Sequence, residues 1–285
     1  MSSREAQMKA RITVLCENTV IKPGALIGEH GFSALVERGD EKVLFDTGQG
    51  YGLVHNARIL GIDLNSVKKA VISHGHNDHT GGLAEFLRVG GPRDVYAHSG
   101  IFDPRYREVP DGPPKPIGIP FTRAHLEGLG ANFHLSAEPQ KVAEGVHTTG
   151  VVPRETSFEK GDQTLLVGCE DGSCSRDPLS DDLSLIVEGE TGMIVLLGCA
   201  HSGLVNILNH VRKVLPEKPV KAVVGGTHLG MCTEEQMAAT IEAMADMGVE
   251  RVGASHCTGL AGAARLREAL GDSFYFAGVG SVLEV

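Results

Sequence analysis

The segment HGHNDH, residues 74–79, combines three imidazoles and one carboxylate within six residues. It follows an apolar run and precedes a pair of glycines, so we predict a loop that leaves the end of a buried strand. On such a loop, His74 and His76 can point to one metal ion, while Asp78 and His79 point to a second ion about 3.5–4 Å away. The alternative is a polar turn with surface histidines, but clustered imidazoles carry a desolvation cost that a metal would offset.

This ligand set predicts a reactive centre. Imidazole and carboxylate ligands without cysteine are typical of catalytic sites that leave coordination positions open to water. Two cations can lower the pKa of a bound water from about 16 toward about 7 and stabilise charge on an ester or phosphoryl oxygen. We therefore expect two divalent metal ions, with zinc preferred and manganese or iron as alternatives, because these ligands discriminate poorly between them.

The elements around the segment must bring further ligands to it. Apolar periodicity predicts strands at 11–16, 32–37, 42–46, 67–73, 164–169, 183–188, 193–197, 221–226 and 251–255, and helices at 52–62, 81–89, 202–215, 233–247 and 260–270. Residues 101–121 hold six of the 13 prolines, which predicts a long surface excursion that could form a lid or rim. Two sheets packed face to face with helices outside would satisfy this layout in both halves.

VLFDTG (residues 43–48) followed by SHGHNDHTGG resembles the metallo-β-lactamase superfamily, whose signature is HxHxDH after an earlier aspartate at a strand end. The resemblance implies an α/β fold, an αββα sandwich of two mixed sheets with outer helices, in a single domain over residues 1–285. It also implies that Asp46 supports the metal-bearing loop through hydrogen bonds without binding metal. A simple turn residue is the alternative for Asp46.

The same resemblance points to ligands in the second half of the chain. In GCAHSG, His201 is the preferred metal ligand and Cys199 is the alternative, at a place where the superfamily usually carries a bridging aspartate. His256 in HCTG lies where the family has its last histidine ligand. Asp182 or its neighbour Asp181 could supply an oxygen ligand or form a solvated turn. For both histidines, a hydrogen-bonded core residue at a strand end is the other interpretation.

Two further residues are candidates for substrate contact. His228 follows the predicted strand 221–226 and is expected to face the substrate as a catalytic or binding residue, with Asp78 as the other catalytic candidate. Arg154 in TGVVPRE could bind a phosphate with two hydrogen bonds, or could form an exposed salt bridge instead. The other histidines lack such a context, and most are expected to be ordinary surface or core residues: His30, His55, His98, His125, His134, His147 and His210.

Several blocks, among them TGVVPRETSFE, GCAHSGLVNIL, VVGGTHLG and HCTGL, resemble one branch of the superfamily. This branch contains 7,8-dihydropterin-6-yl-methyl-4-(β-D-ribofuranosyl)aminobenzene 5′-phosphate synthases and related metal-dependent hydrolases. We expect a hydrolase that attacks an ester or a phosphate-bearing small molecule through a metal-bound hydroxide. The alternatives are a transferase that uses a dihydropterin diphosphate and releases pyrophosphate, and a non-catalytic metal sensor.

The charge and composition of the chain limit the classes of molecule that it is expected to bind. The formal charge of −10 and the pI near 5.7 argue against nucleic acid, so we expect a small-molecule substrate, which the Arg154 hypothesis makes anionic. The N-terminal residues lack a signal-peptide pattern, and no apolar stretch approaches the roughly 20 residues of a membrane span. Six scattered cysteines predict neither a disulfide scaffold nor a cysteine-rich zinc module. We therefore predict a cytoplasmic protein without a membrane partner; its oligomeric state stays open.

Overall fold

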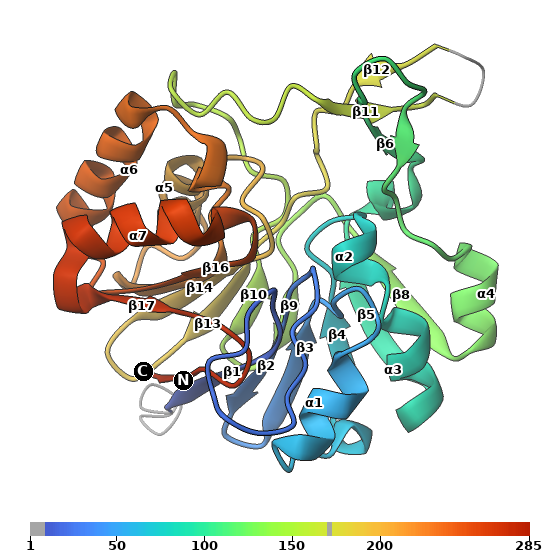
Figure 1. Cartoon of the computed structure of the whole chain (residues 1–285). Helices are drawn as coiled ribbons and strands as arrows, with labels where there is room; N and C mark the ends of the chain where they lie inside the picture. Colours follow the sequence, from blue (N-terminus) through green and yellow to red (C-terminus); the bar gives the residue numbers. More distant parts are fainter. Residues whose placement is uncertain (1–8, 170–172) are drawn as a thin grey trace.

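Two seven-stranded sheets pack face to face, with helices on both outer faces (Figure 1). The computed structural model describes residues 9–169 and 173–285. The first sheet runs in the order β18 (Val282–Glu284), β1 (Ala10–Cys16), β2 (Ser33–Arg38), β3 (Glu41–Phe45), β4 (Lys69–Val71), β5 (Arg93–Ala97) and β8 (Ala131–Leu135). The second runs β17 (Phe274–Phe276), β16 (Arg251–Ser255), β15 (Val220–Gly226), β14 (Met193–Leu197), β13 (Leu185–Glu188), β10 (Val146–Thr148) and β9 (Lys141–Ala143).

The alternation of side chains along the strands explains the layers. In β2, Ala34 and Val36 enter the core between the sheets, whereas Leu35 faces the outer helices. In β14, Ile194 enters the central core and Val195 packs under the helices of the second sheet. Because both faces of these strands are apolar, each sheet needs a covering layer on both sides. The predicted fold class, an αββα sandwich of two mixed sheets with outer helices, is confirmed.

The outer helices form one layer on each sheet. The first sheet is covered by α1 (Leu53–Ile59), α3 (Leu83–Gly90) and α4 (Arg123–Gly128), and the second by α5 (Leu204–Val214), α6 (Glu234–Asp246) and α7 (Gly259–Leu270). One-turn elements at loops are α2 (Asn77–Thr80), η2 (Leu64–Ser66), η3 (Ser99–Phe102), η4 (Leu229–Met231), η5 (His256–Thr258) and η6 (Gly271–Ser273). Among the described residues, no helix is both long enough and apolar enough to cross a bilayer.

Two predicted elements differ in detail. The strand predicted over 67–73 is shorter, because the amide of Ser73 donates to the Asp46 carboxylate at 2.7 Å and leaves the strand ladder. The helix predicted over 81–89 is preceded by a separate turn, α2, which carries two of the candidate ligands. Both differences place irregular backbone at the HGHNDH segment.

A small third sheet lies beyond the sandwich (Figure 1). Its strands are β12 (Ser175–Arg176), β11 (Leu165–Val167), β6 (Arg105–Arg107) and β7 (Lys115–Pro116). The proline-rich residues 101–121, predicted as a surface excursion, thus contribute two short strands to it. The amide of Asn77 donates to the Ile117 carbonyl at 2.8 Å, so this excursion is bonded to the HGHNDH segment.

One cysteine pair forms a bridge that the sequence analysis did not predict. Cys169 and Cys174 form a disulfide at the third sheet. The remaining cysteines of the described residues are free: Cys16, Cys199, Cys232 and Cys257. The prediction that the chain is not a disulfide scaffold agrees with this single local bridge.

Candidate metal centre

The candidate ligands lie after the carboxyl ends of strands from both sheets. The HGHNDH segment follows β4, a parallel neighbour of β3 in the first sheet. His201, His228 and His256 follow β14, β15 and β16, which are parallel neighbours in the second sheet. Because carboxyl ends of parallel strands meet at one edge, residues far apart in sequence are brought to one place.

Three histidines form the first donor group. His74, His76 and His201 are buried, and each offers a ring nitrogen within 4.8 Å of the others. His74 Nε2 lies 3.0 Å from His76 Nδ1. Two nitrogens bound tetrahedrally to one zinc ion at about 2.0–2.1 Å would be roughly 3.3 Å apart. The observed spacing is therefore close to that of a metal-bound pair.

A second donor group lies beside the first. His79 Nε2 is 3.2 Å from His256 Nε2 and 3.9 Å from Asp78 Oδ2. Asp78 Oδ2 is also 3.4 Å from His256 Nε2. The Cys199 thiol joins this group, with its Sγ 3.3 Å from His79 Nε2. One carboxylate, two imidazoles and a thiol thus surround a second place for a cation.

Buried nitrogens without partners show that these residues fit a metal. Within the part of the chain that the structure describes, neither ring nitrogen of His201 has a hydrogen-bond partner, and the same holds for Nε2 of His76. Buried polar groups are normally hydrogen-bonded. Bare nitrogens facing other imidazoles are the arrangement that a bound cation would satisfy.

Protonation states point the same way. Burial lowers the pKa of His76 to about 3 and that of His256 to about 4. It also holds the pKa values of His74 and His201 well below the usual range. These imidazoles are therefore neutral near pH 7, which is the form that binds metals.

Asp46 holds the metal-bearing loop from below. Its buried carboxylate accepts three hydrogen bonds of 2.7 Å, from the Ser73 amide, the Ser73 hydroxyl and Nδ1 of His79. The last bond fixes the ring so that Nε2 faces the donor group. Burial opposes a charge on His79, but the Asp46 and Asp78 carboxylates outweigh burial and raise its pKa to about 9.

Asp181 and Asp182 brace the loops and lie outside both donor groups. Asp181 Oδ2 accepts the Gly75 amide at 2.8 Å, and its other oxygen lies 2.8 Å from Arg105 Nη2. Asp182 Oδ2 accepts the Ser202 amide at 2.7 Å. Both carboxylates are buried and bonded to donors of the loops, so the alternative of a solvated turn is wrong. A role of either carboxylate as an oxygen ligand stays a prediction.

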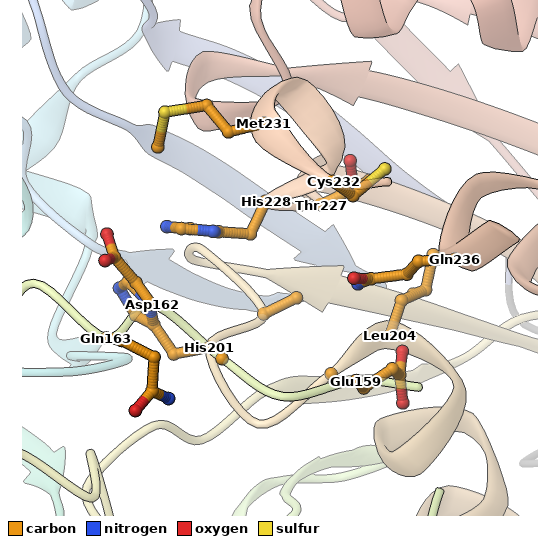
Figure 2. A pocket seen from close by; sticks show the side chains of 13 residues that line it. Glu159, Asp162, Gln163, His201, Leu204, Thr227, His228, Met231, Cys232 and Gln236 are labelled. Atoms are coloured by element: carbon orange, nitrogen blue, oxygen red, sulfur yellow. The ribbon is translucent and has the colours of Figure 1, made fainter. Parts of the chain in front are cut away.

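A pocket of about 200 Å³ opens beside His201. Figure 2 shows the side chains of His201, His228 and Asp162 gathered on one side of this pocket. The His228 ring centroid is 4.7 Å from that of His201. Burial lowers the pKa of His228, so its ring is neutral near pH 7. His228 lies where a substrate next to the donor groups would meet it.

Arg154 supports the His201 loop. Its Nη1 donates to the His201 carbonyl at 2.6 Å, and its Nη2 donates to the Pro178 carbonyl at 2.9 Å. Two donors that the phosphate hypothesis requires are therefore engaged with main-chain oxygens. Arg154 as a substrate contact stays a prediction.

Backbone strain gathers at the same edge. Asp46, Ala200, His228 and His256 have positive φ values of 56°, 55°, 54° and 52°. Non-glycine residues adopt this conformation at an energetic cost, and such residues cluster at functional sites. The surrounding hydrogen bonds hold the strained positions, and each places a side chain or a turn next to the donor groups.

The chain is similar to a known protein family and to a curated enzyme. Residues 26–169 match the family model described as "Metallo-beta-lactamase superfamily". The chain is also 31% identical over 239 residues to the 7,8-dihydropterin-6-methyl-4-(beta-D-ribofuranosyl)-aminobenzene-5′-phosphate synthase of Methanocaldococcus jannaschii, and the match covers 81% of each protein. The chain belongs to the metallo-β-lactamase superfamily. The superfamily and the name of this relative indicate a metal-dependent enzyme.

Solved structures of this superfamily agree. The crystal structure of Tm1679, described as a metal-dependent hydrolase of the beta-lactamase superfamily, has a TM-score of 0.82 and 28% identity, and the match covers 97% of this chain and 99% of that one. Zn(2+)-bound PqqB from Methylobacterium extorquens has a TM-score of 0.55 at 13% identity, over 96% of this chain and 100% of that one. The PqqB likeness shows the fold alone.

His30 is a site residue that the sequence did not reveal. Its Nε2 lies 3.2 Å from Asp78 Oδ2, and its ring centroid is 5.1 Å from that of His256. The ligands predicted from the sequence follow apolar strands, whereas His30 precedes β2 on an irregular loop. No local sequence pattern distinguishes His30 from the other surface histidines of the chain.

Proposed function

We propose that this superfamily member is a dinuclear metal-dependent hydrolase that acts on an ester or a phosphate-bearing small molecule. The convergence of two donor groups, each with ligands from both sheets, carries the proposal, together with the buried ring nitrogens of His76 and His201 that lack hydrogen-bond partners among the described residues. A purely structural histidine cluster would be expected to satisfy those nitrogens.

The proposed ligands divide between two ions, with zinc preferred over manganese or iron. His74, His76 and His201 would hold one ion. The second would be held by Asp78, His79 and His256, with the Cys199 thiol in reach of the same place. Two divalent ions held there would supply Lewis acidity toward an ester or phosphoryl oxygen and lower the pKa of a coordinated water.

The chain's own residues orient the reaction. Although burial opposes it, the neighbouring imidazoles hold the pKa of Asp78 well below its usual range, so this carboxylate is an anion that can orient a proton. His228 faces the pocket as a neutral ring and can exchange a hydrogen bond with a substrate oxygen. Asp46 keeps the His79 tautomer fixed, and Arg154 holds the His201 loop.

A transferase is the second candidate, and the 31% identity to the M. jannaschii synthase favours it. In that reaction the same donor groups would hold the diphosphate of a dihydropterin while an aminobenzene acceptor displaces pyrophosphate. The pocket beside His228 would then have to exclude water from the reacting carbon. Both candidates use one set of ligands and act on a small-molecule substrate.

Metal analysis joined to an activity screen tests the proposal. We expect close to two metal ions per chain and turnover of a phosphodiester or a lactone; turnover only with a dihydropterin diphosphate and its acceptor would favour the transferase. His76→Ala and His256→Ala should each lose one ion and activity. His134→Ala is the matched control, because this half-exposed histidine lies on the edge strand β8 and pairs with Asp94 of β5.

The outcomes separate the alternatives. Retention of both ions in the His76 and His256 variants would contradict the ligand assignment. Full metal occupancy of the natural protein without turnover of any of these substrates would favour a metal sensor and would overturn the enzymatic proposal.

A further inference from the structure

Among the described residues, three arginines lie near the candidate metal centre. Two of them are held by protein acceptors, although Nη1 of the buried Arg105 has no partner there. Arg105 is 3% exposed and lies 2.8 Å from each of Asp177 and Asp181. Arg154 donates to two main-chain carbonyl oxygens. Arg107 differs, because its side chain is 51% exposed on strand β6 of the third sheet.

Arg107 has donors to spare. Within the part of the chain that the structure describes, Nη2 of Arg107 forms an ion pair with Asp162 Oδ2 at 3.4 Å. This distance is longer than the roughly 2.7–2.9 Å of a strong charge-assisted bond. Asp162 is itself held in place, since its Oδ1 accepts both the amide and the hydroxyl of Thr164 at 2.8 and 2.7 Å. A guanidinium has five N–H groups, so Asp162 can orient Arg107 without saturating it.

The position of Arg107 is fixed relative to the metal-bearing loop. Ile117 donates to the Arg105 carbonyl at 2.9 Å, and its own carbonyl accepts the Asn77 amide at 2.8 Å, so β6 is linked to the HGHNDH segment by two main-chain bonds. Asp162, the partner of Arg107, lines the same pocket as His228.

A like charge stands opposite Arg107. In the antiparallel pair of β6 and β7, Arg107 is the register partner of Lys115, which is also exposed. Directly opposed residues share one face of a sheet, and like charges there destabilise it. The chain as a whole carries a formal charge of −10. Two opposed cations in the third sheet of an acidic protein form an unfavourable arrangement that a bound anion would relieve.

We propose that Arg107, supported by Lys115, binds a phosphate group of the substrate at the mouth of the pocket, away from the bond that is broken. The proposal rests on the proposed function, because it assigns one end of the substrate of that same site. The guanidinium would give two parallel hydrogen bonds to phosphate oxygens, and Asp162 would keep its plane in the required orientation. Arg107 thereby acts as a binding residue and does not touch the reacting atoms.

Titration calorimetry with pyrophosphate tests this subsite on the metal-loaded protein. Arg107→Ala should weaken pyrophosphate binding by roughly tenfold, the expected effect of a half-exposed charge-assisted contact. Arg107→Lys should retain part of the affinity, and Lys115→Ala should lose roughly two- to threefold. Arg176→Ala is the matched control: this arginine lies in the same sheet, is 55% exposed and pairs with Glu108, and its loss should leave the affinity unchanged.

Metal content, measured on the same samples, separates the two proposals. If the ions are bound and Arg107→Ala binds pyrophosphate like the natural protein, the Arg107 subsite is overturned while the metal centre stands. Absence of pyrophosphate binding to the loaded protein also overturns it. If no metal binds, the proposed function fails. The Arg107 subsite is then decided by titrating the metal-free protein, where Arg107-dependent binding supports it and unchanged or absent binding rejects it.

Discussion

Replacement of Asp46 by alanine should weaken both the fold and metal binding. The carboxylate is fully buried and accepts three hydrogen bonds of 2.7 Å, from the Ser73 amide, the Ser73 hydroxyl and His79 Nδ1. Alanine leaves the amide and the ring N–H without an acceptor. The Ser73 hydroxyl is less affected, because His74 Nδ1 lies 2.8 Å away and can accept its proton.

The magnitude follows from these contacts. A buried donor left without a partner costs about 1–3 kcal/mol, so the loss for two donors is roughly 2–6 kcal/mol of unfolding free energy. Loss of a partner that orients a metal-binding histidine typically lowers metal affinity about 10–100-fold. Asp46→Asn keeps an acceptor for the ring of His79 and should show the smaller effect on both quantities.

Urea denaturation of the metal-free protein and zinc titration against a competing chelator measure the two effects of Asp46→Ala. Ser33→Ala is the control: its hydroxyl is equally buried and donates to the main-chain oxygen of Asp46 at 2.8 Å. It should cost about 1 kcal/mol and leave zinc affinity unchanged. Zinc affinity of Asp46→Ala within twofold of the natural protein would refute the assigned role.

Four other outcomes follow from the same geometry. Cobalt-loaded protein should show a near-ultraviolet thiolate-to-cobalt band that disappears in Cys199→Ser and survives in Cys257→Ser; survival in both would remove Cys199 from the ligands. Although burial opposes it, two neighbouring carboxylates raise the pKa of His79 to about 9 in the metal-free protein. Metal loading at pH 7 should therefore release about one proton from this ring, and loading above pH 9 should release much less. Calorimetry in buffers of different ionisation enthalpy counts the released protons, and equal release at both pH values would contradict His79 as a ligand. Arg105→Ala leaves two buried carboxylates unpaired and should cost about 3–5 kcal/mol in urea denaturation, whereas the exposed pair lost in Arg176→Ala should cost under about 1 kcal/mol; similar losses would argue against a buried pair. Removal of metal by a chelator should lower Tm. The unfolding free energy should fall by about 2.7 kcal/mol if free metal stood at 100 times its dissociation constant, and an unchanged Tm would exclude tight binding.

The sequence predicted the parts of the site that are local or that follow long strands. The HGHNDH segment has its ligands within six residues, so its chemistry is visible without the fold. His201 and His256 follow strands of five buried or mostly buried residues, and such strands end at a common edge. Their convergence with His74 and His79 was predictable because parallel strands leave little choice of direction.

The remainder depends on structure that leaves little trace in sequence. The strands of the third sheet are two or three residues long. Only β11 falls within a predicted strand, 164–169, because the others are too short for a period of two to show. The positions of Arg107 and Lys115 therefore emerged only from the register. For Asp181 and Asp182 the sequence left an oxygen ligand and a solvated turn as alternatives. In the structure their oxygens meet main-chain amides of other loops, which no spacing rule predicts.

Each candidate metal position draws ligands from both sheets, and this arrangement has a physical consequence. His74 and His76 leave the first sheet while His201 leaves the second; Asp78 and His79 likewise meet His256 across the sandwich. Ions held there would join the two halves at one edge, so metal binding and docking of the sheets are thermodynamically linked. Bound metal would therefore stabilise the docked arrangement of the two sheets, including the strained and buried residues at this edge.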